Sequence, residues 1–317
     1  MITKKVMALL FCSMAIHGFA QTKGKDFKAV DEFVKKTGSL DSLTMGTISE
    51  IVTKPFADKT EKVRAIFDWI AYNISYDCKS GRTGNTQKNS TDEVLLYRKA
   101  VGIGYATLFQ DMCSSANIRC LTVDGYVKKN KEEINDPKTD INHSWAVVQL
   151  GQSPEDWFYV DPTWGSGYTD ADIKNFTKAY NDAYFFADKH LFNLQHYPDN
   201  EAWKLGEAPK NRKDFYALPL IKAAVYEFDL KKFSPANGNI KVKTGKPQSF
   251  SFNLDGKTAI DKVSLLIGDN KKQKMKEVQF SIANGAVSFV HTFEEGDYPV
   301  TILLNGKELL TYQIEVE

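Results

Sequence analysis

Hydrophobic and polar positions divide this chain into two parts with different patterns. Up to about residue 210, apolar residues recur at helical spacing or in short continuous runs, as in amphipathic helices and buried strands. From Phe228 to Glu317, short alternating runs are broken by Gly, Asn, Asp and Pro, which is typical of β-structure. A length of 317 residues agrees with two domains. We therefore predict an α+β domain over residues 21–210 and an all-β domain over residues 215–317.

Helical spacing is clearest between Lys59 and Ile74, where one apolar stripe follows the candidate N-cap Asp58. The polar residues 79–91 predict an exposed loop. Apolar runs after the last helix predict strands of one sheet, and a helical segment followed by antiparallel strands favours the α+β class. Further helices are expected over Asp26–Lys36, Thr47–Ile51, Thr91–Tyr97 and Val101–Ala116, and the strands over Arg119–Val127, His143–Leu150 and Trp157–Val160.

The second part predicts a β-sandwich of immunoglobulin type. Asn305-Gly306 is a strong signal for a two-residue hairpin turn. No pair of cysteines with a tryptophan marks an antibody-like core, so this prediction rests on the strand pattern. The strands are expected over Ser249–Leu254, Lys262–Ile267, Glu277–Ile282, Ala286–Val290, Tyr298–Leu304 and Leu310–Val316.

The first twenty residues have the pattern of a secretory signal peptide. Lys4 and Lys5 precede an apolar run, and small residues end it at Ala20. The run is too short for a membrane span, and no other segment could provide one. We expect export, either to a periplasm or out of the cell. Removal of both lysines changes the formal net charge from +1 to −1, and a balanced chain without a basic block does not favour nucleic acid as a partner.

Three cysteines follow the predicted cleavage site: Cys78, Cys113 and Cys120. Because exported proteins form disulfides, Cys113 in a helix and Cys120 in the next strand are the most plausible pair. The alternative is that all three are small buried apolar residues.

Three segments occur in the chain order of a Cys-His-Asp hydrolase or acyltransferase, but the thiol is missing. A helix start is followed by a histidine and then an aspartate, each of the latter on an apolar strand. The residues at these positions are Gly102, His143 and Asp161. The segments are Arg98-Lys-Ala-Val-Gly-Ile-Gly-Tyr-Ala-Thr-Leu-Phe109, His143-Ser-Trp-Ala146 and Val160-Asp-Pro-Thr-Trp-Gly165.

These segments resemble the transglutaminase-like superfamily, and within it the kyphoscoliosis-peptidase branch. The family pattern reads R-x-G-V-C-x-G-Y-A-x-L-F, then H-[AS]-W-N, then V-D-P-T-W-G, and the resemblance covers residues 60–205. The chain departs from it at Gly102, where the family has cysteine, and at Ala100 and Ala146. The resemblance implies a transglutaminase/papain-like fold, with His143 as the base and Asp161 as the residue that orients its ring.

Aromatic residues near these motifs are candidates for lining a cleft, with Trp145, Trp164 and Tyr105 foremost and Trp157 a further candidate. Burial in the core is the alternative for most of them. His196 is interpreted as a packed, hydrogen-bonded residue. No metal-ligand spacing and no phosphate-binding glycine motif occur, so no metal or other cofactor is expected.

The favoured function is non-catalytic: a pseudoenzyme whose vestigial cleft binds a protein or peptide partner, or a component of the cell envelope. The rival is an active peptidase or protein-glutamine acyltransferase with an unrecognised nucleophile. A third possibility is that the glycine at position 102 is a sequencing error or an engineered substitution. Natural variation is simpler, because designed replacements are more often Ala or Ser, and reading the native gene at that codon separates these cases.

Overall fold

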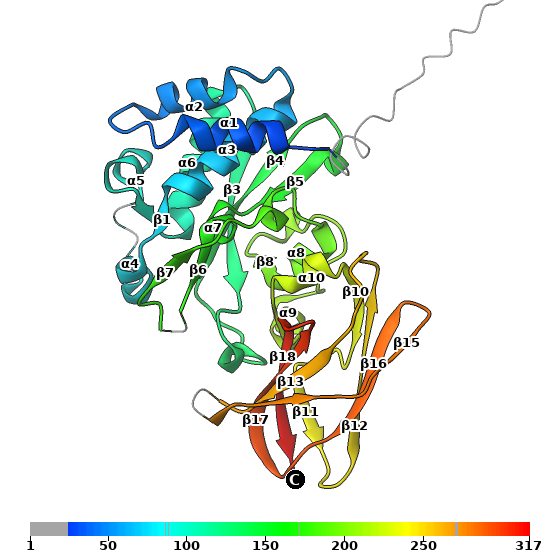
Figure 1. The fold of residues 1–317 in the computed structure, drawn as a ribbon. Coiled ribbons are helices and arrows are strands. Elements are labelled where there is room, and N and C mark those ends of the chain that lie inside the picture. The colour runs from blue at the N-terminus through cyan, green and yellow to red at the C-terminus, as the bar shows by residue number, and fades with distance from the viewer. Residues whose placement is uncertain (1–24, 86, 88, 171, 270–271) are drawn as a thin grey trace, which may run out of the picture.

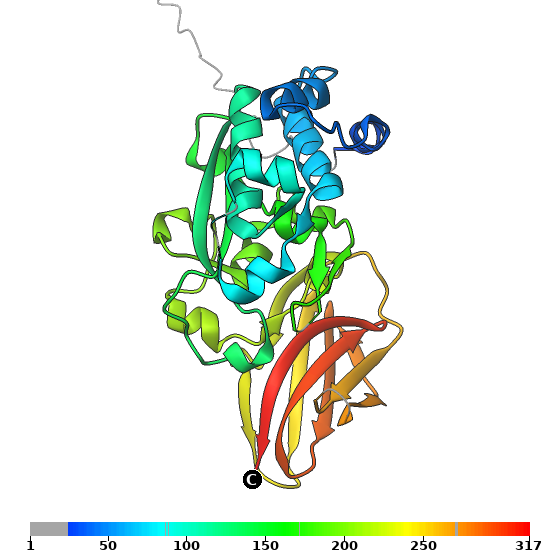
Figure 2. The same ribbon diagram turned by 90° about the vertical axis from the view of Figure 1, so that its left-hand side faces the viewer.

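The protein is described by a computed structural model in which two packed units follow one another (Figure 1). The described residues are 25–85, 87, 89–170, 172–269 and 272–317. The predicted signal peptide, residues 1–20, lies outside them. Helices gather at one end of the molecule, and the C-terminus lies at the far tip of the β-unit (Figures 1 and 2). Among the described residues, no helix combines the length and apolar content needed to cross a bilayer.

The helices of the first unit begin where the sequence supplies caps. The Asp58 carboxylate accepts a hydrogen bond from Glu61 N at 3.1 Å, as predicted for the start of α3. Ser90 and Glu93 form a reciprocal capping box at the start of α5. The main helices are α1 (Lys28–Thr37), α2 (Met45–Thr53), α3 (Lys59–Asn73), α5 (Thr91–Tyr97) and α6 (Gly102–Ser115).

One sheet carries the functional segments of this unit. It is antiparallel, in the order β5-β4-β3-β8, with β3 (Arg119–Val127), β4 (His143–Gln149), β5 (Trp157–Val160) and β8 (His196–Pro198). Strand β4 is buried on both faces. Ala146 and Val148 join the core shared with α3 and α6, whereas Trp145 and Val147 pack with Phe192 in a second core on the other face. This explains why β4 is a continuous apolar run.

Short elements complete the first unit. The expected loop over residues 79–91 is wrong in its first part, because Asp77 Oδ1 accepts hydrogen bonds from Lys79 N and Ser80 N and starts helix α4. The remaining elements are β1 (Ser75–Tyr76), α4 (Cys78–Thr83), β2 (Lys99–Ala100), η1 (Lys131–Glu133), η2 (Pro154–Asp156), α7 (Pro162–Ser166), β6 (Gly167–Thr169), β7 (Phe176–Lys178), η3 (Asp182–Tyr184), α8 (Lys189–Gln195), η4 (Glu201–Trp203), α9 (Arg212–Ala217), β9 (Leu220–Ile221) and α10 (Ala224–Glu227).

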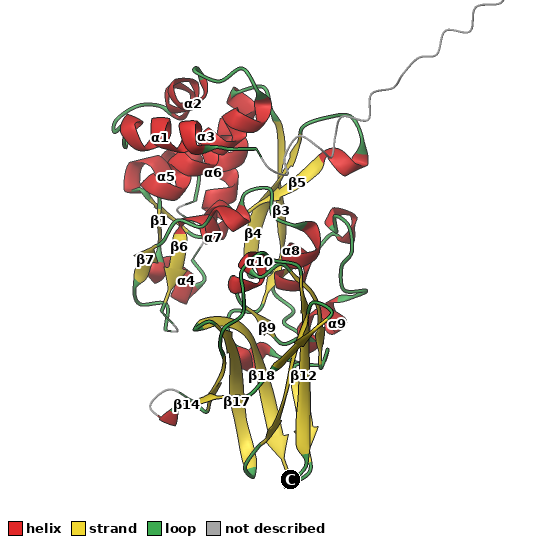
Figure 3. Ribbon diagram, turned by 45° about the vertical axis from the view of Figure 1, so that its right-hand side comes forward, coloured by secondary structure: helices red, strands yellow, loops and turns green. Residues whose placement is uncertain are grey.

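The second unit is a sandwich of two sheets (Figure 3). One has the order β10-β12-β16-β15 and the other β11-β18-β17-β13-β14. Apart from β11, which pairs in parallel with β18, this is the distribution of strands over two sheets seen in immunoglobulin domains. The strands are β10 (Leu230–Ser234), β11 (Asn239–Val242), β12 (Pro247–Leu254), β13 (Val263–Ile267), β14 (Lys274–Glu277), β15 (Ser281–Ala283), β16 (Ala286–Thr292), β17 (Gly296–Leu304) and β18 (Lys307–Val316).

Two local predictions in the sandwich have opposite outcomes. Asn305 and Gly306 have φ values of 50° and 81°, as a two-residue hairpin turn between β17 and β18 requires. The single strand expected over Glu277–Ile282 is wrong, because β14 ends at Glu277 in one sheet and β15 begins at Ser281 in the other. A continuous alternating pattern cannot reveal where a chain crosses between sheets.

The two units share part of their packing. Strand β9 pairs with β18, joining Ile221 to Leu310 in register. Leu191 and Leu194 of α8 are buried in the core of the sandwich. The division of the chain at residues 210–215 stays a prediction, and α8 contributes side chains to both sides of it.

Candidate functional site

The start of α6 is held in place by a side chain from a preceding loop. Val101 is the N-cap residue and has an extended backbone, with no side-chain hydrogen bond capping the helix. The buried Asn89 accepts a hydrogen bond from Val101 N through Oδ1, at 3.1 Å. Gly102 is thereby the first residue of a buried helix end.

His143 and Asp161 meet opposite this helix start. His143 is the first residue of β4, and Asp161 follows the last residue of β5. Their Nε2 and Oδ2 atoms are 2.7 Å apart, and both side chains are almost completely buried. The structure thus brings together the two residues that sequence reasoning paired, and we refer to them as the dyad.

Asp161 also caps helix α7. Its Oδ1 accepts hydrogen bonds from Thr163 N at 2.9 Å and Trp164 N at 3.0 Å. Burial alone would raise the pKa of Asp161, but the neighbouring His143 and the hydrogen bonds to its carboxylate hold the pKa well below its ordinary value. The carboxylate is therefore ionised and fixed in orientation.

His196 is a third member of the site that sequence reasoning missed. Its Nε2 lies 3.1 Å from Asp161 Oδ2, and its ring stacks on Phe192 with 3.8 Å between centroids. Burial lowers the pKa of His196 to about 4, although Asp161 acts in the opposite direction. The sequence suggested a packed, hydrogen-bonded residue, but nothing in its spacing indicated Asp161 as the partner.

Gly102 faces the ring of His143 at very short range. A Cβ built on Gly102 would lie 2.8 Å from His143 Nδ1 and 3.2 Å from Ser144 N. These separations are shorter than ordinary van der Waals contact. The imidazole therefore occupies part of the space that a side chain at position 102 would need.

Comparison with known proteins agrees with this geometry. The family model of the transglutaminase-like superfamily matches residues 47–162, a range that includes Gly102, His143 and Asp161. The chain contains a transglutaminase-like domain. Mouse kyphoscoliosis peptidase is 32% identical over 220 residues, which are 66% of this chain and 33% of that protein. Hillarin of Drosophila melanogaster is 23% identical over 219 residues, 65% of this chain and 26% of its own length.

This chain thus spans about a quarter to a third of the length of the curated relatives it matches. A crystal structure of a TGase aligns with 46% of the chain and 36% of its own length, with 19% identity and a TM-score of 0.28.

The aromatic residues of the transglutaminase-like domain differ in access to solvent. Trp145 and Tyr105 are fully buried, so the expectation that they line an open cleft is wrong. Tyr105 donates a hydrogen bond to Ile74 O at 2.9 Å, and Trp145 packs edge-on against His196. Trp164 is half-buried and lies 5.6 Å from His143 between ring centroids. Trp157 is buried against Trp203.

The three cysteines in the described chain are free thiols. Cys113 and Cys120 are buried in the core around α6, which agrees with the alternative of buried apolar residues. Cys78, at the start of α4, is partly exposed. Burial, followed by the charge of Asp170, raises the pKa of its thiol. A reactive cysteine needs the opposite shift.

His143, Asp161 and His196 also form a compact set of metal-ligating types, with their ligand atoms within 4.8 Å of one another. The distances of 2.7 and 3.1 Å from the two imidazoles to Asp161 Oδ2 are those of hydrogen bonds. Both rings are directed at Oδ2 itself, so an ion between them would require the carboxylate to retreat. Since Oδ1 is held by two backbone amides, the donor set fits a hydrogen-bonded network better than a metal site.

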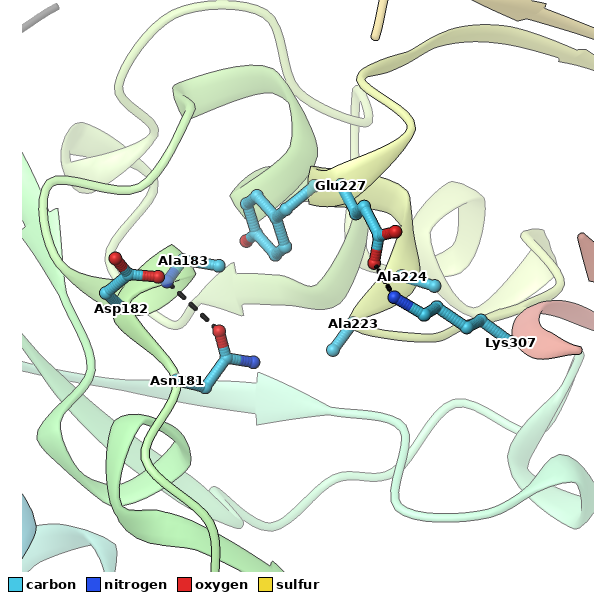
Figure 4. A pocket seen from close by; sticks show the side chains of 8 residues that line it. Asn181, Asp182, Ala183, Ala223, Ala224, Glu227 and Lys307 are labelled. Atoms are coloured by element: carbon cyan, nitrogen blue, oxygen red, sulfur yellow. Dashed lines mark hydrogen bonds and ion pairs between the residues drawn. The ribbon is translucent and has the colours of Figure 1, made fainter. Parts of the chain in front are cut away.

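A cavity of about 530 Å³ lies at the junction of the two units (Figure 4). Its walls include Asn181 to Ala183 of the first unit and Ala224 and Glu227 of α10. Lys307 closes one side through an ion pair with Glu227 at 2.5 Å. No member of the dyad lines this cavity, which is therefore separate from the site at the start of α6.

Proposed function

We propose that this protein is an exported, non-catalytic transglutaminase-like protein whose vestigial cleft binds a polypeptide or envelope partner. The observation that carries the proposal is Gly102 at the helix start that faces His143. Position 102 supplies no atom that can attack a carbonyl, so nucleophilic catalysis in the family's manner is lost. The sandwich would provide a second interaction surface.

No other described thiol is suited to replace the missing nucleophile. Cys113 and Cys120 are packed in the core, and the raised pKa of Cys78 keeps its thiol protonated.

The rival function is an active peptidase or protein-glutamine acyltransferase with an unrecognised nucleophile. The specific observation in its favour is the dyad itself, since a buried 2.7 Å contact between His143 and Asp161 is the arrangement that a working base requires. A relic dyad that connects two strands would have the same geometry.

Reactivity of an introduced thiol separates the two functions. The unmodified chain should show no acyl-transfer or peptidase activity. Gly102→Cys should gain a thiol that reacts faster with an alkylating reagent than Cys78 does, and His143→Ala in the same chain should slow it. Gly102→Ala is the matched control. Turnover by the unmodified chain that His143→Ala abolishes would establish the rival.

Export rests on the pattern of residues 1–20 and has its own test. Protein recovered from its native host should begin at or near Gln21. A species that retains Met1 inside the cell would contradict this part of the proposal.

A further inference from the structure

A second cavity lies between the first unit and the outer face of the sandwich. Its volume is about 590 Å³, within the range of about 300–1,000 Å³ that small-molecule sites occupy. One wall is the segment 131–135, which begins with η1, and the other is formed by β11, β18 and the start of β17. Neither the dyad nor His196 lines this cavity, so it is separate from the site at the start of α6.

The alternation of side chains along β18 directs polar groups into this cavity. Tyr312 is buried in the core of the sandwich, so Gln313 and, two residues further on, Glu315 project from the opposite face. Gln313 is in register with Asn239 of β11, and Glu315 is in register with Asp297 of β17. The sheet therefore presents a row of amides beside a row of carboxylates.

The opposite wall is held against the sandwich by polar contacts. Asn135 N donates a hydrogen bond to Tyr216 O at 2.8 Å, and Asn135 Nδ2 donates one to Asn237 Oδ1 at 3.1 Å. Lys131 forms an ion pair with Asp269, which follows β13. Both walls are thus in place before a ligand binds, which reduces the ordering cost of binding.

Four side-chain amides line the cavity, and one of them has an oxygen without a partner. Gln313 Oε1 is buried and accepts no hydrogen bond from any described residue. An unsatisfied buried acceptor costs about 1–3 kcal/mol, so a ligand that donates to it would gain affinity. An amide offers a donor and an acceptor side by side, which suits a ligand with both functions on neighbouring atoms. The amides belong to Asn135, Asn237, Asn239 and Gln313.

The charges of the lining disfavour an anion. Three carboxylates and two ammonium groups face the cavity, and both ammonium groups are already paired, Lys241 with Glu315 at 2.8 Å. The carboxylates add acceptors that a donor such as a hydroxyl group can use. The carboxylates belong to Glu132, Asp297 and Glu315, and the ammonium groups to Lys131 and Lys241.

We propose that this cavity binds a saccharide through its hydroxyl groups. A hydroxyl group both donates and accepts, so two hydroxyls on adjacent carbons can bond to the two ends of one amide or carboxylate. A peptide is disfavoured, because Ile134 and Ile240 are the apolar residues of the lining, both are buried, and no aromatic ring there could anchor a side chain. This inference goes beyond the proposed function, which concerns the cleft at the dyad.

Titration with small sugars tests the inference directly. The full chain, labelled with ¹⁵N, is titrated with maltotriose, with the trimer of N-acetylglucosamine and with N-acetyl-trialanine amide, and the side-chain amide signals are followed by NMR. We expect at least one trisaccharide to shift the signals of Gln313 and Asn239, and the peptide to leave them in place. Without a ring to stack on the sugar, the dissociation constant should be about 1 mM. Co-sedimentation with purified peptidoglycan distinguishes a polymeric envelope glycan from a free sugar as the source.

Two variants and a control complete the design. Gln313→Ala and Asn239→Ala also assign the two signals, and each should weaken binding by about threefold to tenfold. Asn253→Ala is the matched control, because Asn253 is an exposed asparagine on β12 in the other sheet of the sandwich, and it should leave binding unchanged.

Three outcomes would overturn the saccharide inference. They are no shift with either trisaccharide, shifts with the peptide as large as those with a sugar, and sugar binding that neither Gln313→Ala nor Asn239→Ala weakens. None of them bears on the proposed function, which is judged separately by the thiol experiment at position 102.

Discussion

At Gly102, one added carbon changes the surroundings of the whole site. Its Cβ would meet His143 Nδ1 at 2.8 Å, and the ring cannot easily move because Asp161, Trp164 and His196 surround it. In a tightly packed interior, such a contact is relieved only by shifts of several neighbours.

Gly102→Ala is therefore expected to lower the free energy of unfolding by about 1 kcal/mol, because overpacking of about 1–3 kcal/mol outweighs the helix-propensity gain of alanine. Gly46→Ala in α2 is the matched control. Its Cβ would meet its nearest atom, Ser115 Oγ, at 3.9 Å, so this change should be neutral or stabilising. Urea unfolding measures both variants. A stable Gly102→Ala protein would mean that the ring moves freely.

His196 makes stability depend on pH. Folding lowers the pKa of His196 from 6.5 to about 4. At pH values between these two, the imidazole therefore binds a proton in the unfolded chain but not in the folded chain. Stability should be lost as pH falls through this window, by up to about 3 kcal/mol for this group. His196→Gln should flatten the dependence of unfolding free energy on pH in this range. The ionised Asp161 makes stability depend on pH in a lower pH range, because folding lowers the pKa of its carboxyl group from 3.8.

Among the elements, α3 is terminated by a residue distant in sequence. Lys178 of β7 donates hydrogen bonds from Nζ to Ala71 O, Tyr72 O and Ile74 O at 2.9, 2.9 and 2.6 Å. Ala71 O and Tyr72 O belong to the last turn of α3 and have no partner within the helix, so the lysine joins β7 to the helix end.

Lys178→Met should lower the free energy of unfolding by about 1–2 kcal/mol, because it leaves Ala71 O and Tyr72 O without a donor while it retains the apolar stem. Lys174→Met is the control, since Lys174 is exposed and pairs with Asp172 on the surface. Lys174→Met should change the free energy of unfolding by no more than about 0.5 kcal/mol. Equal free energies of unfolding for the two variants would show that water replaces the lysine as hydrogen-bond donor to the carbonyls at the end of α3.

Elements whose signals are local could be predicted from the sequence. The cap at Asp58, the stripe of α3 and the turn at Asn305-Gly306 depend on neighbouring residues, and each is present as expected. The convergence of His143 and Asp161 followed from the family resemblance. The crossing between sheets after Glu277 and the contact of His196 with Asp161 depend on tertiary packing, for which local periodicity has no signal.

For the whole molecule, α8 connects the two units. Leu191 and Leu194 pack in the core of the sandwich, whereas Phe192 packs against Trp145 and Tyr159 of the transglutaminase-like domain. A helix of seven residues thus has one face in each core.

A fragment of residues 215–317 should still unfold cooperatively, because its two sheets enclose their own core. It should be less stable than a fragment of residues 186–317, since burial of each leucine contributes about 1.5–3 kcal/mol. Urea unfolding of both fragments measures the difference. Equal midpoints would show that α8 is dispensable to the sandwich, and a fragment with no cooperative transition would show that the sandwich depends on the first unit.

The position of α8 has a mechanical consequence. His196 follows directly after the helix. Strand β18, which ends next to the C-terminus, pairs with β9, and β9 contacts α8. Tension applied at the C-terminus would pass through β18 and the shared leucines to the segment that holds His196 against Asp161. A load on the sandwich would then disturb the hydrogen-bonded site before the first domain unfolds. Single-molecule pulling from the C-terminus, with an alkylation readout on Gly102→Cys, would reveal this as a change in thiol reactivity at forces below unfolding.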